Sequence, residues 1–128
     1  MLPLEDQRAI EALLLRYATA ADARDMSLLA SCFTDDVRAD YGEGIGRFEG
    51  RDALIGQLSA MLDACGPTLH YISNIVASGD GEGARVRCYT QAVVRLPGQE
   101  VPLRTAGTYD DRLRRTDGVW RIAERVYT

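Results

Sequence analysis

The chain has 128 residues, of which 46% are hydrophobic and 27% are charged, and this is the size and composition of one globular domain. Lys and Arg number 15 against 19 Asp and Glu, and the resulting net charge of −4 argues against nucleic acid and anionic membranes as partners. The first residues are acidic rather than basic and no apolar run is long enough to span a bilayer, so we expect a cytoplasmic protein that contacts no membrane.

The first half of the chain is predicted to be mainly helical. Apolar residues recur at helical spacing over residues 4–24, and Asp25 is placed to cap a short second helix. Residues 37–41 have the pattern of a strand, and the glycine-rich stretch 42–46 that follows is predicted to be a loop. A third helix is expected over residues 51–64.

The second half is predicted to be a strand meander. Four strand-like segments, over 68–78, 84–96, 101–115 and 119–127, are separated by turns rich in glycine, aspartate and proline. The sequence therefore predicts a single domain over residues 1–128 of the α+β class. Three N-terminal helices would pack on a strongly curved antiparallel sheet, forming a cone-shaped α+β barrel whose open mouth leaves a pocket for a small molecule.

His70 is the only histidine in the chain, and histidine is the one side chain that ordinarily titrates near neutral pH. Strand alternation places it on one face with Ile72 and Asn74. Asp22, at the end of the first helix, is a candidate carboxylate to orient a histidine base. The alternatives are a histidine without a chemical role and an aspartate that only contacts Arg24 or caps the next helix.

Several strings of the sequence carry a resemblance to a known family: RYATAADARD, CFTDDVRADY, FEGRDAL, TLHYISN and DGVWRIAE. They resemble the SnoaL-like branch of the nuclear transport factor 2-like superfamily, and the match covers nearly the whole chain. That superfamily contains isomerases, dehydratases, cyclases and non-catalytic binding domains, so the fold that the resemblance implies does not choose among these activities.

Within that branch the chain looks most like the subset with scytalone dehydratase, bile acid 7α-dehydratase and hexachlorocyclohexane dehydrochlorinase. The resemblance places Asp22 and His70 where those enzymes have an Asp–His pair. It matches Tyr41 to a pocket tyrosine of the two dehydratases, and Tyr17 to a helix-borne tyrosine of the bile acid enzyme. Simple core packing is the alternative for both tyrosines.

The chain also departs from these enzymes. It lacks the second pocket histidine of scytalone dehydratase, and the pocket asparagine of that enzyme is replaced near Tyr109, so we do not expect scytalone as the substrate. A resemblance to ketosteroid isomerase is weaker: Tyr17 fits its helix tyrosine, but its general-base aspartate falls at Tyr41. Asn74 is expected either to line the pocket or to make a structural hydrogen bond. Arg125 is expected to form an exposed ion pair, with contact to an anionic substrate as the alternative.

No motif for a metal or an organic cofactor is present. The three cysteines have no CxxC spacing, so reduced thiols are expected rather than disulfides or a zinc site. The glycines within residues 42–46 do not form a dinucleotide fingerprint. We therefore expect chemistry without a cofactor and without a metal.

The leading hypothesis is a cofactor-independent lyase that performs a dehydratase-type elimination on a small hydrophobic substrate, cyclic molecules included. His70 and Asp22 would form the general base, and Tyr41 would be the third catalytic residue. Tyr17 and Asn74 would bind the substrate. The alternatives are a ketosteroid-isomerase-like isomerase or polyketide cyclase, and a non-catalytic ligand-binding or dimerisation module. The exposed sheet face and edges predict a homodimer or homotrimer.

Overall fold

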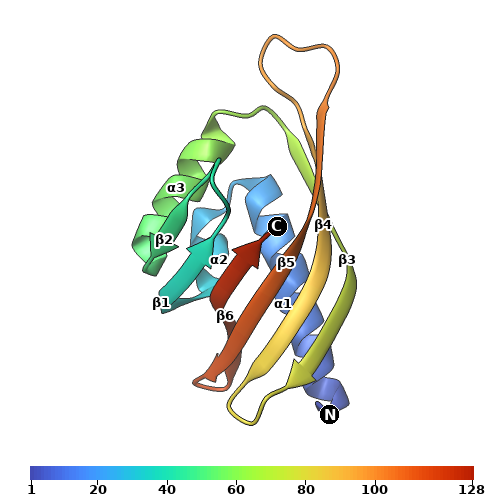
Figure 1. Cartoon of the computed structure of the whole chain (residues 1–128). Coiled ribbons are helices and arrows are strands. Elements are labelled where there is room, and N and C mark those ends of the chain that lie inside the picture. Colours follow the sequence, from blue (N-terminus) through green and yellow to red (C-terminus); the bar gives the residue numbers. More distant parts are fainter.

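The order of elements follows the predicted division into a helical first half and a strand-rich second half (Figure 1). The computed structural model describes all 128 residues. The helices are α1 (Leu4–Ala23), α2 (Met26–Ser31) and α3 (Arg51–Asp63). The strands are β1 (Phe33–Asp40), β2 (Arg47–Glu49), β3 (Thr68–Gly79), β4 (Ala84–Val94), β5 (Leu103–Thr116) and β6 (Val119–Tyr127). None of the helices is long and apolar enough to cross a lipid bilayer.

The junction of α1 and α2 is fixed by local chemistry. Arg24 ends α1 in the left-handed conformation with φ 57°, and its backbone N–H donates to the last turn of the helix. Asp25 follows as the N-cap of α2, and its carboxylate accepts a hydrogen bond from the backbone N–H of Leu28. The chain therefore turns sharply just after Asp22, which leaves that carboxylate at the end of a helix.

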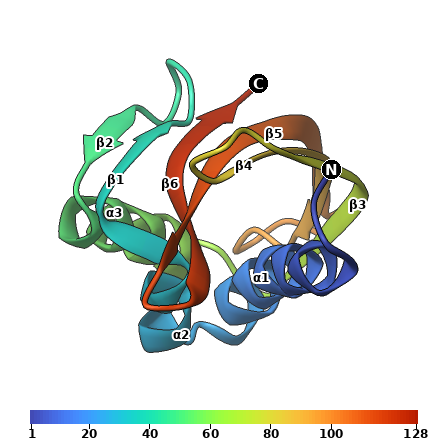
Figure 2. The ribbon, with the colours of Figure 1, turned by 90° about the horizontal axis from the view of Figure 1, so that it is seen from below.

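The strands form one six-stranded sheet in the order β2-β1-β6-β5-β4-β3. The predicted antiparallel meander is confirmed for β3 to β6, whereas β1 pairs in parallel with β6, so the sheet is mixed. The short edge strand β2 was not predicted, and β1 begins four residues earlier than expected. The sheet remains open and curves around the helices, as Figure 2 shows, which confirms the predicted cone-shaped α+β fold.

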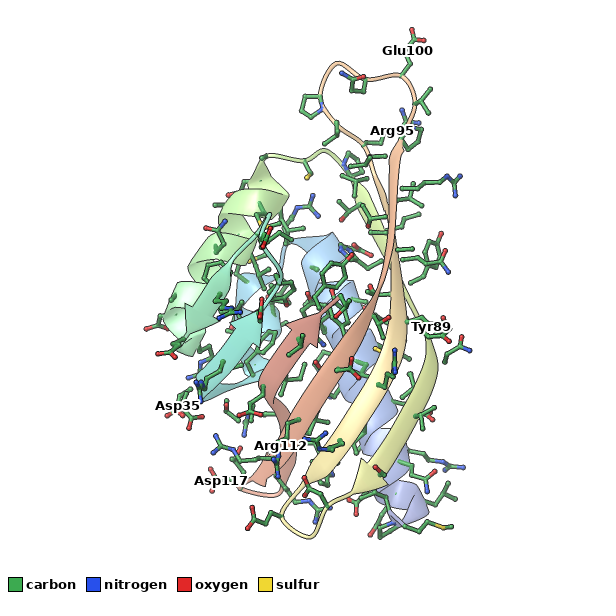
Figure 3. All side chains as sticks on the ribbon, in the orientation of Figure 1. Asp35, Tyr89, Arg95, Glu100, Arg112 and Asp117 are labelled. Carbon is green, nitrogen blue, oxygen red and sulfur yellow. The ribbon has the colours of Figure 1, made fainter.

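The core lies between the helices and the concave face of the sheet. Strand β4 illustrates how the sequence divides the two faces, because its buried and exposed residues alternate. Cys88 is fully buried on the concave side, whereas Tyr89 is 50% exposed. The side chain of Tyr89 points away from the helices (Figure 3). The concave face is thus available to build a cavity, and the convex face carries polar and apolar side chains to the surface.

Strand β3 contains a bulge between Ser73 and Val76, where its pairing with β4 shifts. Asn74 lies within this bulge, with φ 53°, and is exposed. The expectation that Asn74 shares a face with His70 is therefore wrong, because the bulge shifts the alternation and brings Ile75 toward the core instead.

Candidate functional site

A cavity of about 230 Å³ lies between the helices and the concave face of the sheet. Thirteen of its 17 lining residues are hydrophobic. The lining residues are Tyr17, Ala21, Leu29, Tyr41, Ile45, Leu58, Met61, Leu62, Cys65, Thr68, His70, Thr90, Ala92, Val94, Thr105, Tyr109 and Tyr127. A mainly apolar wall with a few polar groups is the usual form of a small-molecule site.

His70 and Asp22 meet at this cavity, although 48 residues separate them in the chain. His70 Nδ1 lies 2.6 Å from Asp22 Oδ1, and the backbone N–H of His70 donates to Asp22 Oδ2 at 2.9 Å. The hydroxyl of Thr68 donates to Asp22 Oδ1, also at 2.9 Å. Asp22 itself does not line the cavity, so it contacts the imidazole on the side that faces away from the cavity.

This arrangement favours one protonation form of the imidazole. An ionised carboxylate can only accept hydrogen bonds, so Nδ1 of His70 must carry a proton to satisfy the short contact with Asp22. In the neutral ring, Nε2 then holds a lone pair, and it makes no hydrogen bond within the protein. A histidine with Nδ1–H bound by a carboxylate and a free Nε2 is arranged to accept a proton.

Three tyrosine hydroxyls gather in the same cavity. The hydroxyl oxygen of Tyr17 lies 3.3 Å from that of Tyr41 and 3.4 Å from that of Tyr109. Burial, followed by the neighbouring phenols of Tyr109 and Tyr41, raises the pKa of Tyr17 well above its ordinary value. Burial likewise raises the pKa of Tyr109. The phenols of Tyr17 and Tyr109 therefore stay protonated and can donate hydrogen bonds.

A buried ion pair lies behind the tyrosines. Arg125 donates from Nε and one terminal nitrogen to the two oxygens of Asp111, each at 2.8 Å, and both side chains are fully buried. The expectation of an exposed ion pair at Arg125 is wrong, because register across β5 and β6 sets Asp111 opposite Arg125 on the interior side. Burial raises the pKa of Asp111, although the facing guanidinium opposes that shift.

The guanidinium of Arg125 also supports the tyrosines directly. Its central carbon lies 4.4 Å from the ring centroid of Tyr17 and 3.7 Å from that of Tyr109. Its second terminal nitrogen donates to the hydroxyl of Tyr41 at 3.5 Å. Burial acts against the charge on Arg125, but Asp111 and the phenols outweigh it and raise its pKa well above the ordinary value. Arg125 thus remains cationic beneath the three phenols.

Tyr127 completes the tyrosine-lined end of the cavity and depends on a glycine. A Cβ at position 107 would lie 2.5 Å from Cε1 of Tyr127, a distance that no real side chain tolerates. Gly107 on β5 therefore allows the ring of Tyr127, at the end of β6, to lie across the sheet.

The structure places four of the five predicted site residues around one cavity. His70, Tyr17 and Tyr41 line it, and Asp22 contacts His70 from behind. Asn74 is exposed and does not line it. The sequence prediction placed Tyr109 near a pocket position of the family but did not name it as a site residue, although the alternation of β5 could have placed it inward.

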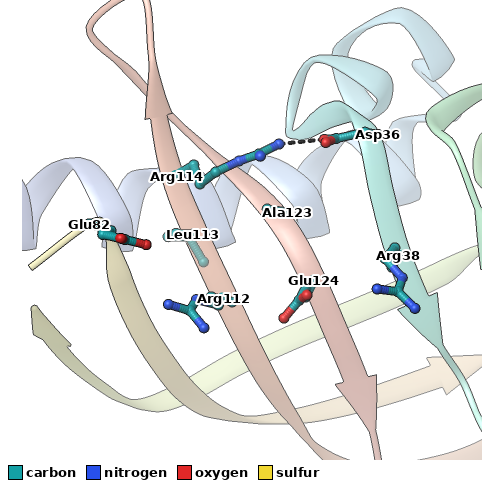
Figure 4. Close-up of a pocket in the computed structure, with 9 residues that line it drawn as sticks. Asp36, Arg38, Glu82, Arg112, Leu113, Arg114, Ala123 and Glu124 are labelled. Atoms are coloured by element: carbon teal, nitrogen blue, oxygen red, sulfur yellow. Dashed lines mark hydrogen bonds and ion pairs between the residues drawn. The ribbon is translucent and has the colours of Figure 1, made fainter. Parts of the chain in front are cut away.

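We found no second site of similar chemistry elsewhere in the structure. No three side chains of His, Cys, Asp or Glu converge in a way that could hold a metal ion. A second depression lies on the outer face of the sheet and is lined mainly by charged side chains, among them Asp36, Arg114 and Glu124 (Figure 4). Asp36 and Arg114 form an exposed ion pair there, far less suited to an apolar ligand than the interior cavity.

A three-helix layer on a cone-shaped sheet, with a small-molecule cavity between them, defines the class of protein. The chain matches the SnoaL-like domain over residues 3–126 and belongs to that family, within the nuclear transport factor 2-like superfamily. Uncharacterised proteins of Mycobacterium tuberculosis and Mycobacterium bovis are 35% identical to it over 128 residues, which covers 98% of this chain and 86% of each relative.

Solved structures with the same fold include proteins with elimination-type names. A Novosphingobium aromaticivorans protein, provisionally named a scytalone dehydratase, has a TM-score of 0.88 at 28% identity, covering 97% of this chain and 83% of that chain. A hexachlorocyclohexane dehydrochlorinase from Novosphingobium barchaimii has a TM-score of 0.86 at 21% identity, covering 98% and 86%, and this likeness shows the fold alone. The family match, together with the neighbour that is 28% identical, supports a family of dehydratase, other lyase or isomerase type that binds small molecules.

Proposed function

We propose that the protein is a cofactor-independent lyase that eliminates water from a small hydrophobic substrate carrying a carbonyl group. The observation that carries the proposal is the 2.6 Å contact between Asp22 and Nδ1 of His70, with the imidazole lining an apolar cavity. The family match and the dehydratase-named neighbour add support.

His70 acts as the general base in this proposal. Nε2 removes the acidic proton from the carbon next to the substrate carbonyl, and Asp22 stabilises the imidazolium that forms. Because Asp22 accepts from both the ring and the backbone of His70, the imidazole stays fixed in one orientation during the proton transfer. Proton transfer by a positioned side chain typically accelerates a reaction by about 10²–10⁴-fold.

The tyrosines stabilise the charge that develops on the substrate. As the proton leaves, electron density moves to the carbonyl oxygen, and the hydroxyl of Tyr41 donates to it. Tyr17, whose hydroxyl contacts that of Tyr41, supports this donor. Arg125 lies beneath both phenols, and its charge favours the anionic intermediate.

Loss of the hydroxyl group completes the elimination in one further step. The electron pair of the broken C–H bond forms the new C=C bond as the C–O bond to the hydroxyl group breaks. The departing hydroxide takes a proton from the imidazolium or from Tyr41 and leaves as water, so the product is an unsaturated carbonyl compound. With one histidine in the chain, either that imidazole or the phenol must supply this proton.

The proposal is tested with a panel of small cyclic and acyclic β-hydroxy ketones. Turnover is followed by the absorbance of the conjugated product and by the loss of one water in its mass. His70→Ala and Asp22→Asn are each expected to lower kcat/KM by about 10²–10⁴-fold, because each removes part of the general base. Asp35→Asn, at an exposed aspartate of β1, is the matched control and should leave the rate unchanged.

Two results would contradict the elimination mechanism. If both His70→Ala and Asp22→Asn turn over a confirmed substrate near the wild-type rate, the assignment of the base is wrong. If the product has the same mass as the substrate, the reaction is an isomerisation. The isomerase alternative uses the same proton abstraction but no leaving group, so the mass of the product separates the two.

A further inference from the structure

Arg24 makes five hydrogen bonds, all to uncharged oxygens, at the end of α1. One terminal nitrogen donates to the hydroxyl oxygen of Thr68 at 2.9 Å and to the carbonyl oxygens of Ala21 and Asp22, at 3.0 and 3.4 Å. The other donates to the carbonyl oxygens of Leu62 and Gly66, at 3.2 and 2.7 Å. Arg24 therefore contacts the backbone of Asp22 but not its carboxylate.

The bond to Thr68 fixes the direction of a hydrogen-bond chain. A guanidinium has no acceptor, so the hydroxyl oxygen of Thr68 must accept from Arg24. The single proton of that hydroxyl is then left to donate to Asp22 Oδ1, at 2.9 Å. The same oxygen of Asp22 accepts from Nδ1 of His70. A directed chain thus runs from Arg24 through Thr68 and Asp22 to the imidazole.

The other terminal nitrogen of Arg24 binds a segment that forms part of the cavity wall. Leu62 lies in the last turn of α3, and Gly66 lies in the connection from α3 to β3. Leu62 and Cys65 of this segment line the cavity. On its far side the segment is held by the backbone N–H of Gly66, which donates to the carbonyl of Arg95 at 2.7 Å. Arg24 is therefore hydrogen-bonded both to this wall of the cavity and to Thr68, the next member of the hydrogen-bond chain that ends at His70.

We propose that Arg24 is a positioning residue that acts through Thr68 on Asp22. It directs the Thr68 proton to Asp22 and thereby keeps His70 in the form with a proton on Nδ1 and a free Nε2. Arg24 touches no substrate in this scheme. The catalytic value of that form rests on the proposed function, but the form itself can be measured without any substrate.

The test uses the fact that the chain has one histidine. Protein labelled with ¹⁵N-histidine gives one pair of ring-nitrogen signals, and long-range ¹H–¹⁵N correlation spectra, recorded where the ring is neutral, report which nitrogen carries the proton. The wild type is expected to show a proton on Nδ1. Thr68→Val and Arg24→Met should raise the ratio of Nε2–H to Nδ1–H forms by roughly two- to tenfold, the effect expected from one hydrogen bond.

Conservative variants separate positioning from packing. Thr68→Ser keeps the hydroxyl and should restore the wild-type ring signals. Arg24→Lys keeps the charge but cannot donate to Thr68 and Gly66 in one fork, so it should behave like Arg24→Met. Arg8→Met, at an exposed arginine on the same helix, is the matched control and should change nothing.

The cavity wall has its own reporter in Cys65. Cys32 and Cys88 are fully buried, and burial raises the pKa of Cys88 to about 11, so a thiol reagent added to the folded protein should modify Cys65 first. Arg24→Met should speed this modification severalfold. The carbonyl oxygens of Leu62 and Gly66 lose their hydrogen bonds from Arg24, so the segment that carries Cys65 is held less firmly. Thr68→Val should not speed the modification, since it leaves the bonds to Leu62 and Gly66 in place.

The proposal is overturned if Thr68→Val and Arg24→Met both fold and keep the wild-type ring signals. If Arg24→Met fails to fold, Arg24→Lys takes its place, and wild-type ring signals in both Thr68→Val and Arg24→Lys overturn the proposal. Failure of the proposed function gives a different result. In that case the ring signals respond as expected while His70→Ala leaves turnover unchanged.

Discussion

The buried pair of Arg125 and Asp111 contacts the residues of the cavity wall without lining the cavity itself. Burying a charge without a partner is expensive, and here two charges satisfy each other through two parallel hydrogen bonds. Tyr17 and Tyr109 pack against the same guanidinium. The pair therefore holds the tyrosine-lined end of the cavity in place.

Removing one partner of this pair should destabilise the protein strongly. Arg125→Met leaves the carboxylate of Asp111 buried without a partner, and we expect a loss of about 3–5 kcal/mol in the free energy of unfolding. Urea denaturation measures this loss. The double variant Arg125→Met with Asp111→Leu should recover part of it, because neither charge is then left unpaired.

The exposed pair of Arg38 and Glu49 provides the matched control for that experiment. Their side chains are 69% and 80% exposed, and Arg38→Met should cost only about 0–1 kcal/mol. A loss at Arg125 no larger than the loss at Arg38 would show that the buried pair does not support the fold.

Among the elements, the turn between β3 and β4 begins with a carboxylate, that of Asp80. Asp80 accepts hydrogen bonds from the backbone N–H groups of Glu82 and Gly83, at 3.1 and 2.8 Å. These bonds, in that order, hold the pKa of Asp80 below its ordinary value, and Arg112 adds to the effect. The ionised form of Asp80 therefore stabilises the folded hairpin.

This shift predicts a pH dependence of stability with a definite sign. A carboxyl group with a lowered pKa in the folded state stabilises the protein above its unfolded pKa, and the stabilisation is lost as the pH falls through the lowered folded value. Asp80→Asn should therefore unfold at lower urea than the wild type at neutral pH, and the difference should shrink in acid. A constant difference at all pH values would mean that the charge of Asp80 has no part in the turn.

The elements also show what the sequence could and could not predict. The three helices, the α2 cap at Asp25 and the four strands of the meander follow from local periodicity and turn residues, and they are confirmed. The parallel pairing of β1 with β6 joins residues nearly ninety positions apart, such as Phe33 and Ile122, and has no local signal. The bulge that exposes Asn74 could not be predicted from the local sequence either, because it depends on the pairing of β3 with β4.

In the candidate site, too, the residues with a signal in the sequence were predicted, and those that depend on tertiary contacts were not. His70 was prominent as the only histidine, and Asp22 and the tyrosines were chosen largely through the family resemblance. The pairing of Arg125 with Asp111 was missed because an arginine is ordinarily exposed, and only the register of β5 against β6 brings its partner inside. The hydrogen bonds of Arg24 likewise require α1, α3 and β3 to be in place.

For the whole molecule, the outer face of the sheet supports the prediction of self-association. Leu69, Tyr71 and Tyr89 lie on the neighbouring strands β3 and β4 and are 55%, 53% and 50% exposed. Large apolar side chains gathered on one face commonly mark an interface. We expect a homodimer or homotrimer, with this face covered by a second copy of the chain.

Light scattering coupled to size-exclusion chromatography measures the mass in solution. Combining Tyr71→Arg with Tyr89→Arg should shift the protein toward the monomer, because charges would be buried in the interface. Leu15→Arg, at a residue of α1 that is also 50% exposed, should leave the mass unchanged. A monomer at every concentration of the wild type would contradict the prediction.

The central position of β6 has a consequence for the order in which the protein can form during its synthesis. Residues 119–127 lie between β1 on one side and β5 on the other, so they join the two halves of the sheet. Until the ribosome has released these residues, the strands β1 and β2 and the strands β3 to β5 lack the strand that pairs with both groups. We therefore expect the complete sheet, and with it the cavity wall that Tyr127 contributes, to form only after residues 119–127 have left the ribosome.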